Sequence, residues 1–140
     1  DFEIGKGIVL REGSDCTIAA CGITVQMALD AADSLKHEGI SCRVLDLFSI
    51  KPIDATLLEK AARETGGIVT CEEHNIMAGF GSAVSEVVSE TYPVPMRRIG
   101  VRDKFGESAR DNEIPLLLQK HGMTSVHIAN AVKDIRSKTR

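Results

Sequence analysis

Aromatic residues are scarce in this 140-residue sequence, which contains no tryptophan, one tyrosine and four phenylalanines. Because apolar residues still make up 43% of the chain, its core must be built from aliphatic side chains. Such a core suits a parallel sheet covered by helices better than an aromatic-rich sandwich or barrel. The length predicts a single domain, residues 1–140, with a core on both faces of the sheet.

The sequence also lacks a strong excess of charge and a long apolar run. Acidic residues outnumber Lys and Arg by 20 to 17, and the basic residues are dispersed, which argues against a nucleic-acid surface. The basic stretch 133–140 is expected to be a frayed, solvated terminus. Without a membrane-length apolar run or an opening signal peptide, we expect a cytoplasmic protein with no membrane partner. Because the first residue is Asp1 and not Met, we expect a piece of a longer polypeptide.

Cysteine is present, but in no disulfide or metal-binding pattern. Cys16, Cys21, Cys42 and Cys71 show no C-x-x-C spacing and fall in or beside apolar segments. We therefore expect buried free thiols in a reducing compartment, and neither a disulfide framework nor a zinc site.

Strand-like and helix-like segments alternate along the sequence. The expected strands are residues 5–12, 16–21, 43–48, 68–71 and 96–101. Four helices are expected to begin at the N-capping residues Thr24, Asp54, Ser82 and Thr124. A further short helix is expected at residues 114–121. This alternation predicts an α/β fold with a mainly parallel sheet of about five strands.

Residues 67–88 concentrate the polar chemistry of the chain. The apolar strand 68–71 leads into Glu72-Glu73-His74-Asn75, and Gly79-Phe80-Gly81-Ser82 then opens a helix. Ligands and partners of open α/β sheets bind at the carboxyl ends of the strands. Function should therefore be sought in this segment.

The two glycines of this segment allow two interpretations. Gly79-x-Gly81-x-x-Val84 is a partial dinucleotide-binding fingerprint, and Asp103 lies about 20 residues further on, where a ribose-binding acid belongs. However, residues 72–78 separate the strand from the first glycine, and Val84 stands where a small residue would let the helix approach the strand. We therefore favour the second interpretation, in which the glycines permit a sharp turn and close backbone packing.

The acidic run beside the strand is a candidate for chemistry. Glu72, Glu73 and His74 could form a general base with an orienting acid, or part of a metal site. One histidine with two adjacent acids offers few ligands, and adjacent side chains of an extended chain point apart. A hydrogen-bonded loop or a subunit contact is therefore the favoured interpretation.

Two further groups of polar residues are expected to be structural. Asp46 interrupts an apolar strand, so it should lie near a strand end or be paired if it is buried, and a partner such as Arg43 or Lys51 is favoured. Residues 106–108 could form an anion-binding nest beside basic residues, although a solvated loop is favoured. Those basic residues are Arg102, Lys104 and Arg110. No complete active site can be assembled, so we predict no catalytic, cofactor-binding or metal-binding residue in this chain.

Several motifs resemble those of the C-terminal domain of transketolases. They include VLDLFSIKPID at residues 44–54, the Glu72-Glu73-His74 run and GFGSAV at residues 79–84. RDKFGES at residues 102–108 and LLLQKHGMT at residues 116–124 are also similar. Together these motifs cover nearly the whole chain in the expected order.

The resemblance implies a three-layer α/β/α domain with a mixed five-stranded sheet whose first strand is antiparallel to the rest. It implies a parent enzyme of the pentose phosphate pathway that moves a two-carbon ketol unit between sugar phosphates with thiamine diphosphate and Mg²⁺. Both cofactors belong to upstream pyrophosphate- and pyrimidine-binding domains, so this chain alone is expected to be catalytically incomplete. In the family, the C-terminal domain serves dimer contact and stability.

Related assignments remain open. The glycine segment is shared with deoxyxylulose-phosphate synthase and with the β subunit of 2-oxo acid dehydrogenases, whose tail can dock an acyltransferase core. A regulatory module that binds a nucleotide or an anion is a further alternative. One departure from the resemblance is Ala78, where relatives often place another glycine.

The apolar residues of segment 67–88, which are expected to be exposed, predict an interface. Ile76, Met77 and Phe80 are interspersed with charged residues, a pattern typical of a partner surface. We expect this surface to face a second copy of the chain around a two-fold axis, with the glycines allowing close approach. The predicted interface residues are Glu72, Glu73, His74, Gly79, Phe80, Gly81 and Ser82.

Overall fold

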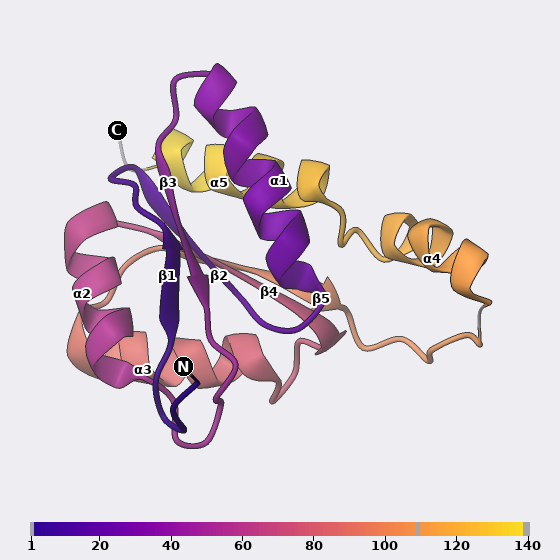
Figure 1. Ribbon diagram of the computed structural model, residues 1–140, viewed down its shortest axis with the longest axis horizontal. Coiled ribbons are helices and arrows are strands. Elements are labelled where there is room, and N and C mark those ends of the chain that lie inside the picture. Colours follow the sequence, from indigo (N-terminus) through magenta and orange to yellow (C-terminus); the bar gives the residue numbers. More distant parts are fainter. Residues whose placement is uncertain (1, 109, 139–140) are drawn as a thin grey trace.

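A five-stranded sheet in the order β1-β3-β2-β4-β5 forms the centre of the computed structural model, which describes residues 2–108 and 110–138 (Figure 1). The strands are β1 (Ile8–Arg11), β2 (Cys16–Ala20), β3 (Cys42–Asp46), β4 (Ile68–Asn75) and β5 (Met96–Val101). Strand β1 pairs antiparallel with β3, and the remaining neighbours are parallel. The predicted α/β fold with a mixed, mostly parallel sheet is confirmed.

Helices cover both faces of the sheet and make it the middle of three layers (Figure 1). Helices α1 (Thr24–His37) and α5 (Ser125–Lys138) pack on one face, and α2 (Ala55–Thr65) and α3 (Phe80–Thr91) pack on the other. Successive strand residues point to opposite faces, so Val44 joins the α1–α5 core and Leu45 joins the α2–α3 core. Both cores are almost entirely aliphatic, as the composition predicts.

Local capping signals explain several helix boundaries. Asp54 Oδ1 accepts a hydrogen bond from the amide of Leu57 at 3.0 Å, which confirms Asp54 as the N-cap of α2. Gly66 ends the same helix with a φ of +67°, in the left-handed region that favours glycine. Helix α5 begins directly after Thr124, as expected.

Three predicted boundaries are wrong. Helix α3 begins at Phe80, so Ser82 lies inside its first turn and is not its cap. Thr24 is the first residue of α1, and its hydroxyl donates to the carbonyl oxygens of Cys21 and Cys71 at 2.8 Å, so it is not a cap either. Strand β4 continues to Asn75 because its pairing with β5 extends to this residue, so the polar run 72–75 is the end of a strand and not a loop.

The expectation of a frayed basic terminus is also wrong for the described part of residues 133–140. Helix α5 continues to Lys138, and its basic residues form ion pairs that tie the helix to α1, to residues preceding β2, or to itself. The pairs are Lys133–Glu38, Arg136–Asp15 and Lys138–Asp134. Residues 139–140 lie outside the described residues.

The four cysteines are free, and all but Cys21 are buried, which agrees with the expected thiols. Over residues 2–108 and 110–138, no helix is both long enough and apolar enough to span a membrane.

A segment between β5 and α5 projects away from the three layers (Figure 1). We call residues 102–108 and 110–120 the arm; it contains a 3₁₀ turn, η1 (Asp111–Glu113), and the short helix α4 (Ile114–Lys120). Leu118 is the one buried residue of α4. The arm is therefore an extension of the sheet's carboxyl edge with little covering of its own.

Candidate functional site

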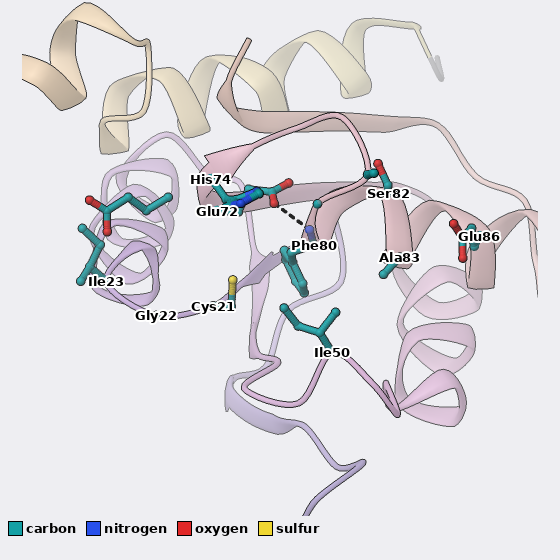
Figure 2. A pocket seen from close by; sticks show the side chains of 13 residues that line it. Cys21, Gly22, Ile23, Ile50, Glu72, His74, Phe80, Ser82, Ala83 and Glu86 are labelled. Carbon is teal, nitrogen blue, oxygen red and sulfur yellow. Dashed lines mark hydrogen bonds between the residues drawn. The ribbon is translucent and has the colours of Figure 1, made fainter. Parts of the chain in front are cut away.

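A hollow of about 580 Å³ lies at the carboxyl edge of the parallel strands (Figure 2). It is lined by residues that follow β2, by Ile50, by the end of β4 and by the first turns of α3. Figure 2 shows the side chains of Cys21, Ile50 and Phe80 around this space. We call it the edge pocket; its apolar floor and its position match the place where open α/β sheets bind ligands and partners.

Glu72 is a buried, hydrogen-bonded acid in the lining of the edge pocket. Its side chain is 1% exposed, and its two carboxylate oxygens accept hydrogen bonds from the amides of Phe80 at 2.6 Å and Gly81 at 2.9 Å. These amides belong to the first turn of α3, whose N–H groups have no partner inside the helix. The negative charge also lies at the positive end of the helix dipole. Glu72 therefore fastens the end of β4 to the start of α3.

Both glycines of the segment make room for this carboxylate. A Cβ on Gly79 would overlap Glu72 Oε2, and a Cβ on Gly81 would lie 2.6 Å from Thr70 Oγ1 and 3.1 Å from Glu72 Oε1. The preferred interpretation of the glycines, close packing of backbone, holds for Gly79, which approaches the carbonyl oxygen of Asn75, whereas Gly81 packs closely against side chains. Since Gly81 packs internally, a bulky residue there would disrupt the packing beside Glu72. An effect of such a residue on self-association could therefore not be assigned to contact with a second copy.

The first turn of α3 does not fit a diphosphate. The amides that would bind one already hold Glu72, and the entering phosphate would meet a buried carboxylate. Asp103, the candidate ribose-binding acid, instead accepts a hydrogen bond from Asn75 Nδ2 at 3.4 Å. Across the described residues, no three His, Cys, Asp or Glu side chains gather into a metal-binding group.

The other predicted site residues are divided between the surface and the interior. Glu73 and His74 are exposed, and His74 Nδ1 lies 3.1 Å from the carbonyl oxygen of Asn75. Gly79 and Ser82 are half-buried, and Phe80 and Gly81 are buried with Glu72. The acids and the histidine do not converge on a common point, because successive strand residues alternate in direction. Of the apolar residues expected to be exposed in this segment, Ile76 and Phe80 are buried and Met77 is exposed, so the expected apolar surface is wrong for the first two. Whether this segment contacts a second copy stays a prediction.

Ser82 and Arg98 close one wall beside the pocket. The hydroxyl of Ser82 donates to the carbonyl oxygen of Ile76 at 3.0 Å. Arg98 Nη1 donates to the same carbonyl oxygen at 2.9 Å and to the Ser82 hydroxyl oxygen at 3.0 Å. The strand β5 therefore helps to fix the turn between β4 and α3. This turn also contains Ala78, whose φ of +58° lies in the left-handed region. The backbone thus explains why glycine is favoured near this position.

The expected partners of Asp46 are wrong. The guanidinium of Arg43 binds Glu12 and Glu64 instead, at 3.0 and 2.6 Å. No ion pair joins Asp46 to Arg43 or Lys51 among the described residues, and burial raises the pKa of the Asp46 carboxyl. In the arm, Glu107 pairs with Lys120, so this part of the proposed anion nest carries a neutralised acid.

Cys21 is a pocket residue that sequence reasoning did not single out. Burial, followed by the nearby charges of Glu72 and Asp46, raises the pKa of its thiol to about 11. It is half-buried and lines the edge pocket, whereas the other cysteines are enclosed by the sheet and helices. Its position at the carboxyl end of a predicted strand was the available signal.

Comparison with known families decides the classification of this fold. Residues 5–128 match the model of the family described as transketolase, C-terminal domain. The chain belongs to the transketolase C-terminal domain family. Relatives of this family domain include a 6-deoxy-6-sulfo-D-fructose transketolase subunit from Clostridium sp. (strain MSTE9), 41% identical over 138 residues. That alignment covers 99% of this chain and 42% of the relative.

Two further relatives widen the range of reactions represented. The 1-deoxy-D-xylulose-5-phosphate synthase of Heliobacterium modesticaldum is 40% identical over 138 residues, covering 98% of this chain and 21% of the relative. An apulose-4-phosphate transketolase subunit from Phocaeicola vulgatus is 46% identical over 114 residues, covering 81% and 36%. This transketolase C-terminal domain therefore spans less than half the length of these curated relatives.

Solved structures agree with the family assignment. A structure described as a split gene transketolase, inactive beta4 tetramer, is 48% identical and superposes with a TM-score of 0.90, covering 99% of this chain and 44% of that chain. The transketolase from Leishmania mexicana superposes with a TM-score of 0.70 at 21% identity, covering 96% and 18%, which supports the fold alone.

Proposed function

We propose that this chain is the C-terminal domain of a thiamine diphosphate-dependent transketolase, which moves a two-carbon ketol unit from a ketose phosphate to an aldose phosphate. The observation that carries the proposal is the family match over residues 5–128, together with transketolase subunits among the relatives at 41–46% identity. Thiamine diphosphate and Mg²⁺ would be held by pyrophosphate- and pyrimidine-binding domains outside this chain.

The role of the domain in that enzyme is assembly and stability. Each carboxylate oxygen of Glu72, the most enclosed acid of the candidate site, accepts a hydrogen bond from a backbone amide, which supports a structural role for this acid. The solved structure at 48% identity is described as a beta4 tetramer, which supports self-association. Free cysteines support a reducing setting, the cytoplasm.

A ketol-transfer assay tests the proposal. The 140-residue chain with thiamine diphosphate, Mg²⁺, a ketose phosphate and an aldose phosphate should give no transfer. The same mixture with a polypeptide that supplies the pyrophosphate- and pyrimidine-binding domains should give transfer. Turnover by the chain alone would show that it is catalytically complete, and failure of the complete enzyme with every sugar phosphate pair would contradict the reaction class.

A second candidate function is supported by the synthase relatives. The 40% identity to the Heliobacterium enzyme is close to the 41% identity with the Clostridium transketolase subunit. The complete enzyme should therefore also be assayed for formation of 1-deoxy-D-xylulose 5-phosphate. Formation of this product without ketol transfer would assign the chain to the synthase branch.

A further inference from the structure

The arm carries apolar side chains that nothing in the described chain covers. Phe105 is fully exposed, Leu116 is 71% exposed and Ile114 is 37% exposed. Helix α4 makes its main packing contact with the neighbouring turn η1 and not with the sheet. A fully exposed aromatic side chain on a projecting segment is typical of an anchor for a partner.

The edge pocket has the opposite character. Its floor is apolar, formed by Cys21, Ile50 and Phe80 (Figure 2). Its lining includes three acids and one histidine but no Lys or Arg among the described residues. Because the Glu72 carboxylate is held by backbone amides, Glu73 and Glu86 are the exposed acids at its rim. The pocket therefore suits an apolar group accompanied by positive charge.

The arm presents such a group. Phe105 directly follows Lys104, and Arg102 and Arg110 lie on the same segment. Asp103 and Glu107 lie equally close to Phe105 in sequence, and Glu107 is paired with Lys120. Within residues 102–110 the three bases outnumber these two acids. An aromatic anchor with flanking cations thus matches an apolar pocket with acids at its rim.

We propose that Phe105 on the arm of one copy inserts into the edge pocket of a second copy, with Lys104 facing the acidic rim at Glu86. The proposal deepens the assembly role stated above and rests on it. The arm leaves the sheet beyond β5 and projects away from the body, whereas the pocket lies between the end of β2 and the start of α3, so the chain's own arm is directed away from its own pocket (Figure 1). Both surfaces lie at one edge of the sheet, so a two-fold axis there makes the exchange reciprocal.

The first test measures self-association of the 140-residue chain by sedimentation across concentration. Both hydrophobic cores are complete within the chain, and Phe105 contributes to neither. Phe105→Ser should therefore leave the fold intact and weaken association by about tenfold or more. Val126→Ser, at a 64% exposed position beside the α1–α5 groove, is the matched control and should leave the association constant unchanged.

The second test exchanges the charges. Lys104→Glu and Glu86→Lys should each weaken association about threefold or more, because each places like charges together. The double variant should recover most of the wild-type affinity. Recovery requires that these two side chains face each other, and a double variant weaker than both single variants would overturn the pairing.

The third test uses Cys21, which lies in the pocket. In Gly106→Cys, which keeps Phe105 and has open space at the new Cβ, a short bis-iodoacetamide at a pH of about 9 should join the new thiol to Cys21 of another copy and give a covalent dimer, the alkaline pH offsetting the raised pKa of Cys21. Val126→Cys should give none. A link within one chain, or a wild-type chain that stays monomeric, would overturn the proposal. Neither result touches the ketol-transfer assay, so the failures of the two proposals can be told apart.

Discussion

The two ends of the sheet handle charge in different ways. At the amino end, acids and bases neutralise each other: Arg43 lies between Glu12 and Glu64, and Asp15 binds Arg136. At the carboxyl edge, Glu72 is held by two backbone amides and forms no ion pair among the described residues. The amino end is thus closed by ion pairs, whereas the carboxyl edge is organised by one buried carboxylate.

This difference separates a structural end of the molecule from an end that is open to partners. The ion pairs of the amino end are partly exposed, and such pairs contribute little each. The carboxyl edge combines a costly buried charge, an apolar hollow and exposed acids. A buried acid that is fully satisfied by the backbone fixes the shape of that edge while leaving its surface available for contact.

Among the changes that test the difference between the two ends, removal of Glu72 should lower the free energy of unfolding most. Glu72→Ala leaves two buried amides without an acceptor, and we expect a loss of about 3 kcal/mol in the free energy of unfolding. Glu64→Ala, the matched change at the amino end, should cost less than about 1 kcal/mol. Urea unfolding of both variants measures the difference, with Glu72→Gln expected between them. Equal losses at the two ends would refute the contrast.

Crowding of the carboxylate should have the next largest effect. In Gly81→Ala the new Cβ would meet Thr70 Oγ1 at 2.6 Å, so we expect a loss of about 2 kcal/mol. Gly106→Ala, in the arm, has nothing within 4 Å and should change the free energy of unfolding by less than about 0.5 kcal/mol. Thermal or urea unfolding distinguishes them, and similar values for both would show that the space beside Glu72 is not tightly filled.

Asp15 should make the stability of the amino end depend on pH. A hydrogen bond from the Ser41 amide, at 2.7 Å, and the guanidinium of Arg136 lower the pKa of this carboxyl below its ordinary value of 3.8. The ionised form therefore stabilises the fold above pH 3.8, and this contribution is lost as the pH falls through the lower folded-state pKa.

Asp15→Asn is the variant that isolates this effect. At pH 7 it should lower the free energy of unfolding by about 1 kcal/mol. The gap between Asp15→Asn and wild type should narrow as unfolding is measured at successively lower pH below 3.8. A gap that stays constant with pH would mean that the charge of Asp15 is not what stabilises this end.

The smallest expected effect is a gain at the carboxyl edge. Ala78 has a φ of +58°, which costs an L-residue more than glycine, so Ala78→Gly should raise the free energy of unfolding by about 0.5 kcal/mol. Ala83→Gly, in the right-handed helix α3 nearby, should instead lower it by about 1 kcal/mol. If the two Ala→Gly changes shift the free energy of unfolding in opposite directions, the backbone conformation at each position, and not the loss of the alanine methyl group, determines the effect.

The elements that were predicted well carry strong local signals. Strand β5 was expected at residues 96–101 and is found there, between two prolines and a polar segment. Asp54 and Gly66 bound α2 because capping chemistry depends on residues only a few positions away. The apolar residues Ile128, Val132 and Ile135 of α5 are spaced so that one face of the helix enters the core.

The parts that were missed depend on contacts between distant residues. The extension of β4 to Asn75 follows from its pairing with Val101, and a polar sequence gives no sign of it. Glu72 looks exposed in the sequence, and its burial depends on donors eight and nine residues away that become available only when α3 folds back. The partners of Arg43 are likewise set by the tertiary fold.

The two faces of the sheet also differ in when they can be completed during synthesis. The α2–α3 core has all its residues once β5 has left the ribosome, whereas the opposite core waits for Ile128, Val132 and Ile135 of α5. At the usual pace of translation, residues 102–138 take roughly 2 to 7 seconds to appear. For that interval Ile18 and Val44 are covered by α1 alone, so the length of the arm and of α5 together sets how long one face of the nascent sheet stays only partly covered.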